Sequence, residues 1–190
     1  MKTTTAILFY LIFSGILSVS TLGANGPKDP GGVGNGAIGF GIGPGLGFYG
    51  STGVGPAFLV HYDQSLWQAG PGCLSLGGQI GTSFFSNSYD ISGTGYKAHW
   101  INFGFIGRCA YHYGWKVPGL DTYGGFGAGS RISLYSDNND LTDKKGLEIG
   151  FQPTAFFGAT YYFNDVVGVN AEMGENFAFF SFGLNFRIVR

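Results

Sequence analysis

The sequence contains little charge, few prolines and only 2 cysteines. Charged side chains make up 11% of its 190 residues, less than half the share in soluble domains, which is roughly 25%. Aromatic residues make up 17%, which excludes intrinsic disorder, and the net charge of −1 excludes a protein that binds nucleic acid through a basic surface. With 7 prolines and no three-residue glycine period, collagen is excluded as well. Beyond the N-terminus, no apolar run reaches the roughly 18 residues that a membrane helix needs.

The N-terminus has the pattern of a secretory signal peptide. Lys2 gives a positively charged start, an apolar stretch covers residues 6–17, and small residues follow at 18–24. We therefore predict a signal peptide that is cleaved after Ala24, with an N-terminal anchor helix as the alternative. No cysteine lies near the cleavage region, so a lipoprotein anchor has no attachment site.

From Gly36 onward, apolar residues alternate with glycine, small or polar residues. A period of two residues is typical of β-strands and is not produced by a helix. The pattern is clearest where Phe103 and Phe105 alternate with Asn102 and Gly104. Eight such stretches follow one another, at residues 36–49, 55–64, 72–85, 97–113, 120–135, 148–163, 165–174 and 177–189.

The distribution of the 36 glycines indicates which face of these strands points outward, because the glycines concentrate on the parity opposite the aromatic residues. A water-facing surface made mainly of glycine is a poor one, whereas a narrow, filled lumen suits small residues. We therefore predict an all-β fold, an eight-stranded antiparallel up-and-down transmembrane β-barrel, with its aromatic parity facing lipid. The barrel occupies residues 36–190, behind a flexible Gly- and Pro-rich lead at 25–35. The longest predicted links, at 86–96 and 136–147, lie on the outside.

Four segments resemble the small outer-membrane β-barrel proteins of the porin-like superfamily, in particular the Bacteroides-type family, which is similar in architecture to OmpX and the membrane domain of OmpA. They are RCAYHYG (108–114), LDTYGGFGAGSRI (120–132), FFGATYYFNDVVGVNAEMG (156–174) and FFSFGLNFRI (179–188). The resemblance implies insertion into the outer membrane of a Gram-negative cell envelope by the barrel-assembly machinery. It implies outer-membrane lipid as the surroundings, and neither enzymatic activity nor a cofactor.

Several charged residues fall on the parity predicted to face the lumen. Buried charges are tolerated only when they are paired, so we predict a lumenal charge network with at least one contact between an arginine and a carboxylate. Approximate depth along the strands pairs Asp63 with Arg108, and Glu172 with Arg131. An ion or proton path through the barrel is the alternative reading. The network consists of Asp63, Arg108, Arg131, Glu172 and Arg187.

Histidine and cysteine give no sign of a metal or catalytic site. The spacing of His61, His99 and His112 fits no metal motif, and no serine stands beside them at a spacing that suggests a hydrolase. A hairpin centred near residue 91 places Cys73 opposite Cys109, which would form a disulfide in an oxidising compartment. Their parities differ, Cys73 inward and Cys109 outward, so the disulfide remains one of two alternatives.

Aromatic residues near strand ends predict two interfacial girdles. The inner girdle contains Trp67, Tyr113, Trp115, Tyr161 and Phe186, and the outer girdle contains Tyr49, Phe84, Tyr96, Trp100 and Tyr135.

Three functions are compatible with this sequence. The first is a structural or surface-interaction barrel whose outer links contact an unidentified extracellular ligand. The second is a small pore or solute channel, which a lumen filled by eight strands disfavours. The third is a secreted, soluble carrier of the lipocalin type, in which the apolar parity would face inward.

Overall fold

A computed structural model describes residues 31–45, 55–91, 94–137, 145–174 and 177–188. The predicted signal peptide, the first six residues of the lead, Tyr49 and most of the predicted link at 136–147 lie outside these residues. No helix within the described ranges is long and apolar enough to cross a membrane.

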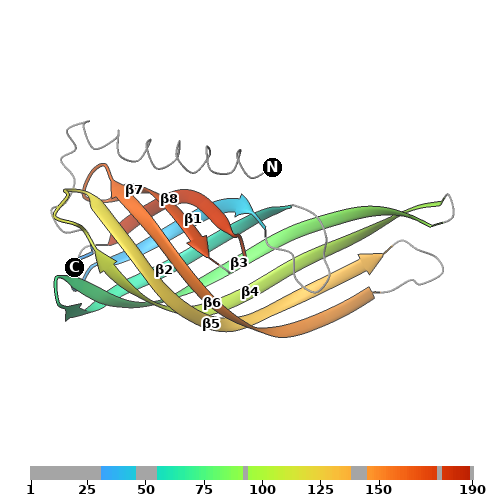
Figure 1. Ribbon diagram of the computed structural model, residues 1–190, viewed down its shortest axis with the longest axis horizontal. Coiled ribbons are helices and arrows are strands. Elements are labelled where there is room, and N and C mark those ends of the chain that lie inside the picture. The colour runs from blue at the N-terminus through green and yellow to red at the C-terminus, as the bar shows by residue number, and fades with distance from the viewer. Residues whose placement is uncertain (1–30, 46–54, 92–93, 138–144, 175–176, 189–190) are drawn as a thin grey trace, which may run out of the picture.

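Eight antiparallel strands pair in chain order and close into a barrel, which confirms the predicted fold (Figure 1). The first strand closes the ring by pairing with the last, with Ile38 opposite Phe186. The strands are β1 (Gly36–Pro44), β2 (Pro56–Ala69), β3 (Gly72–Ile91), β4 (Thr94–Tyr113), β5 (Leu120–Asp137), β6 (Lys145–Tyr162), β7 (Val167–Gly174) and β8 (Phe180–Ile188).

Strands β3 to β6 run far beyond the other four (Figure 1). The predicted link at 86–96 is therefore wrong, because β3 and β4 continue through it with 20 residues each. Tyr89 lies opposite Tyr96, and their rings stack with centroids 5.7 Å apart, which holds the hairpin together where its sequence is polar. The part of β3 beyond Ser83 and the part of β6 before Phe156, with the stretches of β4 and β5 between them, continue past the closed ring, and we call this region the extension. We call the opposite end of the barrel, with its links at 70–71, 114–119 and 163–166, the turn end.

The strand register explains why the extension lies on one side. Followed from Phe40 through β2, β3, β4 and β5, the register reaches Phe151 on β6. Followed the other way, through β8 and β7, it reaches Tyr161 on the same strand. The stagger of the barrel is therefore ten residues, from position 151 to position 161. For eight strands this stagger corresponds to a tilt of roughly 40°, which raises β5 and β6 relative to β1.

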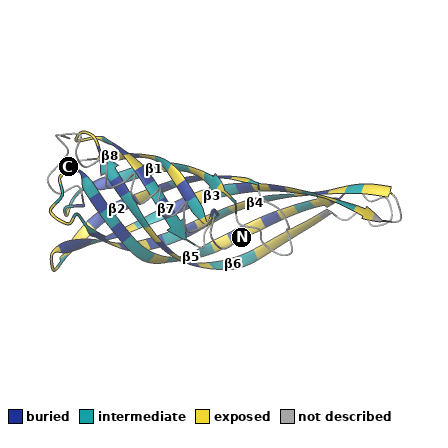
Figure 2. Ribbon diagram, turned by 45° about the horizontal axis from the view of Figure 1, so that its top comes forward, coloured by how far each residue is buried: buried dark blue, intermediate teal, exposed yellow. Residues whose placement is uncertain are grey.

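Buried and exposed residues alternate along the strands, as Figure 2 shows. The exposed parity is apolar, with Phe126 76% and Phe151 72% exposed, whereas the buried parity consists mainly of glycine, polar and charged residues, with a few apolar side chains among them. This orientation contradicts the lipocalin-type alternative, in which the apolar parity would line the interior.

Side chains fill the barrel near its extension end. Phe177, just before β8, is fully buried, and its ring occupies the space above two lumenal glycines. A Cβ atom on Gly81 would lie 2.3 Å from this ring and one on Gly104 would lie 2.5 Å from it. The ring packs in an apolar cluster of Ala57, Leu59, Ile106, Phe177 and Ala178.

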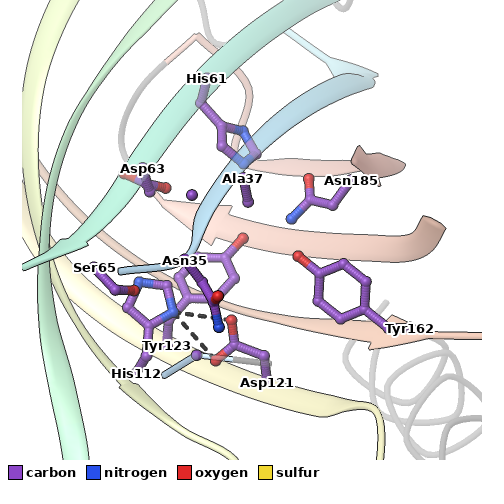
Figure 3. Close-up of a pocket in the computed structure, with 12 residues that line it drawn as sticks. Asn35, Ala37, His61, Asp63, Ser65, His112, Asp121, Tyr123, Tyr162 and Asn185 are labelled. Atoms are coloured by element: carbon purple, nitrogen blue, oxygen red, sulfur yellow. Dashed lines mark hydrogen bonds and ion pairs between the residues drawn. The ribbon is translucent and has the colours of Figure 1, made fainter. Parts of the chain in front are cut away.

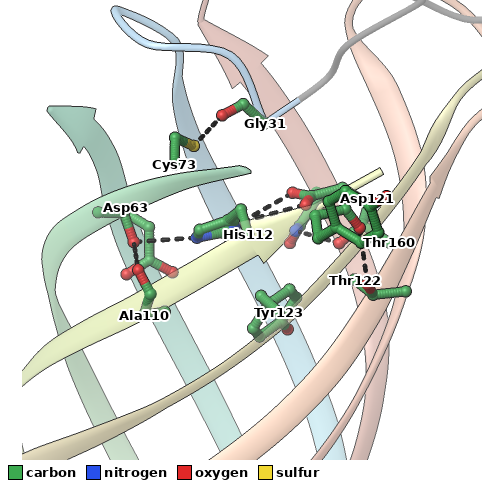
Figure 4. Close-up of polar contacts among 12 residues, drawn as sticks. Gly31, Asp63, Cys73, Ala110, His112, Asp121, Thr122, Tyr123 and Thr160 are labelled. Carbon is green, nitrogen blue, oxygen red and sulfur yellow. Dashed lines mark hydrogen bonds and ion pairs between the residues drawn. The ribbon is translucent and has the colours of Figure 1, made fainter. Parts of the chain in front are cut away.

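At the turn end, the last residues of the predicted flexible lead are bound to the barrel, which corrects that part of the prediction. Gly34 donates its N–H to the carbonyl of Ser65, and the Ser65 N–H donates to the carbonyl of Asn35. The Gln64 side chain donates to the carbonyls of both Gly34 and Asn35, and the Cys73 thiol donates to the Gly31 carbonyl (Figure 4). Residues 31–35 therefore occupy the mouth of the barrel because β2 and β3 satisfy their backbone.

Candidate functional site

An ion-pair cluster lies in the middle of the lumen, around Arg108 of β4. Its Nε atom is 3.1 Å from Oδ1 of Asp63 on β2, and its Nη2 and Nη1 atoms donate to the two carboxylate oxygens of Glu172 on β7, at 2.8 and 3.4 Å. The arginine side chain has no exposed area. Two carboxylates thus share one arginine, and the cluster joins three strands across the barrel.

Uncharged side chains extend the cluster to the remaining wall. Tyr123 of β5 donates its hydroxyl hydrogen to Glu172 at 3.0 Å and accepts one from the Asn170 amide at 2.7 Å. The Phe156 ring of β6 lies 3.9 Å from the guanidinium carbon of Arg108, close enough for a cation–π contact. The buried charges are therefore surrounded by hydrogen-bond donors and by an aromatic face, and the lumen at this level is closed.

Not all of the predicted network comes together. The structure joins Asp63 and Arg108, but Glu172 also pairs with Arg108, so the expected contact between Glu172 and Arg131 is wrong. The register gives the reason: Arg131 lies opposite Gly150 on β6, and Glu172 lies opposite Gly158, eight residues further along the same strand.

The two remaining arginines of the predicted network lie apart from the cluster. Arg131 lies with its guanidinium carbon 5.0 Å from the Phe177 ring centre, near the extension end. Arg187 of β8 lies on the lumenal parity towards the turn end, and its Nε and Nη1 atoms are buried with no hydrogen-bond partner among the described residues. Neither arginine therefore contributes to the ion pairs around Arg108.

A Ser–His–Asp relay near the turn end was missed by the sequence analysis. His112 Nε2 is 2.9 Å from the Ser75 hydroxyl. Its Nδ1 is 3.0 Å from Asp121, and Figure 4 shows this pair. Ser75 and His112 are diagonal neighbours on adjacent strands, because Ser75 lies opposite Ala110, two residues before His112. The sequence could reveal this pair only if the register between β3 and β4 were known.

The relay has the atom order of a hydrolytic triad but no room for a substrate. Ser75 has no exposed area. The cavity beside His112 and Asp121 has a volume of about 20 Å³, enough for a single water molecule (Figure 3). We therefore interpret the relay as a hydrogen-bonded tie between β3, β4 and β5. Among the described residues, no three metal-ligating side chains are placed to hold an ion.

The disulfide alternative is wrong, because Cys73 and Cys109 are separate thiols on opposite faces of the wall. The hairpin is centred beyond residue 91, which places Cys73 opposite His112 and Cys109 opposite Leu76. Cys73 is buried beneath Gly31, whereas Cys109 is exposed on the apolar face.

We predict that the folded protein has the same intact mass with and without reductant. A membrane-permeant maleimide should modify Cys109 in the folded protein and reach Cys73 only after denaturation, as peptide mass spectrometry would show. A loss of two mass units that reductant reverses would contradict this prediction, because it would report a bond between the two thiols.

The aromatic residues predicted for the inner girdle lie on the outer surface of the barrel wall. Trp67 is 53% and Trp115 61% exposed, and Trp115 packs against Tyr113 with ring centroids 4.9 Å apart. Tyr161 contacts Phe163 in the same way, at 5.9 Å.

The outer girdle needs correction, because Trp100 and Tyr135 have the inward parity. They lie opposite each other on β4 and β5, and their rings are 5.2 Å apart. Parity decides this: Ile101 and Leu134, one position away, point outward. Exposed phenylalanines lie on the outer parity of two neighbouring strands, Phe84 on β3 and Phe103 on β4.

The inner face of the extension therefore carries a set of aromatic residues, which we call the aromatic face: Tyr89, Tyr96, Trp100 and Tyr135. The hydroxyls of Tyr89 and Tyr135 both donate to Oδ2 of Asp137, at 2.5 and 2.8 Å. The hydrogen bond to Asp137 raises the pKa of Tyr135 to about 12, so this hydroxyl keeps its proton at neutral pH.

Comparison with known proteins finds solved structures that are similar to this barrel. No protein-family model and no curated protein sequence matches this chain. Among solved structures, Ail, the attachment invasion locus protein of Yersinia pestis, is similar with a TM-score of 0.51 and 10% identity over 83% of this chain and 100% of Ail. A second structure of Ail, in complex with the heparin analogue sucrose octasulfate, gives a TM-score of 0.51 and 9% identity over the same shares. The N-terminal β-barrel domain of Pseudomonas aeruginosa OprF gives a TM-score of 0.49 and 17% identity over 83% of this chain and 99% of that domain. At these identities the likeness to Ail concerns the fold.

Proposed function

We propose that this chain is an outer-membrane β-barrel that holds a β-sheet platform above the cell surface for contact with external partners. The observation that carries the proposal is the extension. Within the described part of the chain, β6 pairs with β7 only from Phe156 onward, and β3 pairs with β2 only up to Ser83. Beyond these points the described parts of β3 to β6 continue past the closed ring as a four-stranded sheet.

The exposed parity supports a position in the membrane. Its aromatic and aliphatic side chains surround the ring of strands, and such a surface is too apolar for a soluble monomer. The closed ring satisfies the backbone hydrogen bonds that lipid cannot satisfy. Together with the predicted signal peptide, these features favour outer-membrane lipid as the surroundings and the barrel-assembly machinery as the route of insertion.

A surface-contact role fits the molecule better than transport or catalysis. The lumen is filled by the Arg108 cluster and by the Phe177 ring, so we expect no conductance from the native protein in planar bilayers. Ser75 of the Ser–His–Asp relay is sealed off from substrates. Ail, which shares the fold, is named for attachment and invasion.

Two single-cysteine variants test this orientation. In a background with both native cysteines replaced by serine, Ser88→Cys places a thiol on the exposed face of β3 in the extension, and Lys116→Cys places one in the link at the turn end. On intact cells, a membrane-impermeant maleimide should label Ser88→Cys and leave Lys116→Cys unlabelled, because only the extension faces outward.

Cell lysis supplies the control for this experiment, since both variants should then be labelled. Recovery of the protein in the soluble periplasmic fraction, or labelling of Lys116→Cys alone on intact cells, would refute the proposal. A shift in gel mobility on boiling should accompany the membrane fraction, because a closed barrel keeps its compact form in detergent.

A further inference from the structure

The aromatic face is continuous across three strands of the extension. Phe85 lies opposite Trp100, and Trp100 lies opposite Tyr135, so the three side chains form one row across β3, β4 and β5. Such a row covers two strand spacings, about 10 Å. Phe85 is buried, whereas Trp100 and Tyr135 are partly exposed. Above the row, the stacked rings of Tyr89 and Tyr96 extend the face toward the tip of the hairpin.

Polar groups border the rings on both sides. On the tip side, Asp137 accepts hydrogen bonds from two tyrosines, which fixes the positions of their rings. On the barrel side, the Asn102 amide donates to Ser83 at 3.2 Å and accepts a hydrogen bond from Ser133. The Asn102, Ser83 and Ser133 side chains are buried and hydrogen-bond to one another. A ligand lying on the rings would therefore meet the tyrosine hydroxyls and, from β6, the exposed carboxylate of Glu148, which lies opposite Ser133.

A sugar has the chemistry that matches this arrangement. One face of a pyranose presents C–H groups that pack on an aromatic ring, while its hydroxyls project at the rim, where carboxylates and amides accept them. Tyrosine and tryptophan supply large contact areas with little loss of conformational entropy. A lipid tail would cover the exposed Glu148 carboxylate without offering it a hydrogen-bond partner, which disfavours a lipid as the occupant.

The charge of the face narrows the class of sugar. Asp137 and Glu148 supply carboxylates on the inner parity, and Glu148 is exposed. The described cations nearby are directed elsewhere: Arg131 is buried against Phe177, and Lys97 lies on the outer parity of β4. Among the described side chains, the face thus presents carboxylates and no cation, which favours a neutral glycan over a sulfated or otherwise anionic one.

We propose that the aromatic face of the extension binds a neutral oligosaccharide, stacked on Trp100 and Tyr135 and hydrogen-bonded at its edges. This inference rests on the proposed function, because the face must be displayed outside the cell to meet a glycan.

Tryptophan fluorescence provides a direct test. In the purified protein in detergent, Trp67→Phe and Trp115→Phe leave Trp100 as the single tryptophan. Titration with hexa-N-acetylchitohexaose, xylohexaose and mannohexaose should change its emission saturably for at least one probe, and a heparin hexasaccharide should not. In this background Tyr135→Ala should weaken binding about tenfold, because it removes one of the two stacking rings. Ile101→Ala, on the outer face beside Trp100, should leave the affinity unchanged.

The outcomes separate this inference from the proposed function. If none of the three neutral probes binds at millimolar concentration, if heparin binds more tightly than all of them, or if Tyr135→Ala binds as well as its parent, the glycan proposal is wrong. Surface labelling of Ser88→Cys on intact cells reports display independently of glycan binding by the purified protein. Tyr135→Phe, which keeps the ring and loses only the hydroxyl, should keep most of the affinity and so controls for misfolding of the alanine variant.

Discussion

Arg108→Ala should lower the free energy of unfolding by about 3–5 kcal/mol, because it leaves two carboxylates buried without a counterion. Asp63 and Glu172 approach the guanidinium from different strands, at 3.1 and 2.8 Å, and both are almost completely buried. In the variant, at least one of them must take up a proton or admit water into the lumen. The loss should appear as a lower urea midpoint in detergent, followed by tryptophan fluorescence and by gel mobility without boiling.

Arg187→Ala is the matched control for this measurement. Arg187 shares the lumenal parity, but within the described part of the chain its buried Nε and Nη1 atoms have no hydrogen-bond partner, so its removal should be neutral or slightly stabilising. A combined replacement, Arg108→Met with Asp63→Asn and Glu172→Gln, removes all three charges and should recover most of the stability. Equal midpoints for Arg108→Ala and Arg187→Ala would show that the ion pairs do not hold the barrel together.

The sequence predicted the wall of the barrel well because parity is a local property. The alternation of residue types within one strand shows which side chains point inward. The inward positions of Asp63, Arg108 and Glu172 could therefore be predicted without knowing the neighbouring strands. Their partners could not be predicted in the same way. A stagger of ten residues around the ring displaces Arg131 from Glu172, and no single strand carries that information.

The extension was missed for a related physical reason. Its segment of β3 reads Ser-Asn-Ser-Tyr-Asp, which is polar on both faces and therefore resembles a loop. Pairing with β4, the ring stack of Tyr89 and Tyr96, and the hydrogen bond from Tyr89 to Asp137 stabilise it as a strand. The interpretation of Trp100 and Tyr135 as girdle residues failed because position near a strand end was given more weight than parity.

Gly125→Ala should reduce stability by about 3 kcal/mol, because the wall has no space for a methyl group there. A Cβ atom on Gly125 would lie 2.0 Å from the carbonyl oxygen of Cys109 and 2.8 Å from the Cα atom of Ala110. Both are backbone atoms of the neighbouring strand β4, so relief requires that β4 and β5 move apart. The high glycine content of the lumenal parity thus allows close approach of adjacent strands, in addition to leaving the lumen narrow.

Gly124, the preceding residue on β5, is the matched control because it points outward. A Cβ atom there would have its nearest contact at 3.7 Å, so Gly124→Ala fits without displacement. Alanine costs less conformational entropy than glycine in a strand, and this variant should be more stable by about 0.5 kcal/mol. Two alanines at consecutive positions should therefore shift the urea midpoint in opposite directions. Equal shifts would mean that glycine is needed on β5 for its flexibility rather than for the contact between β4 and β5.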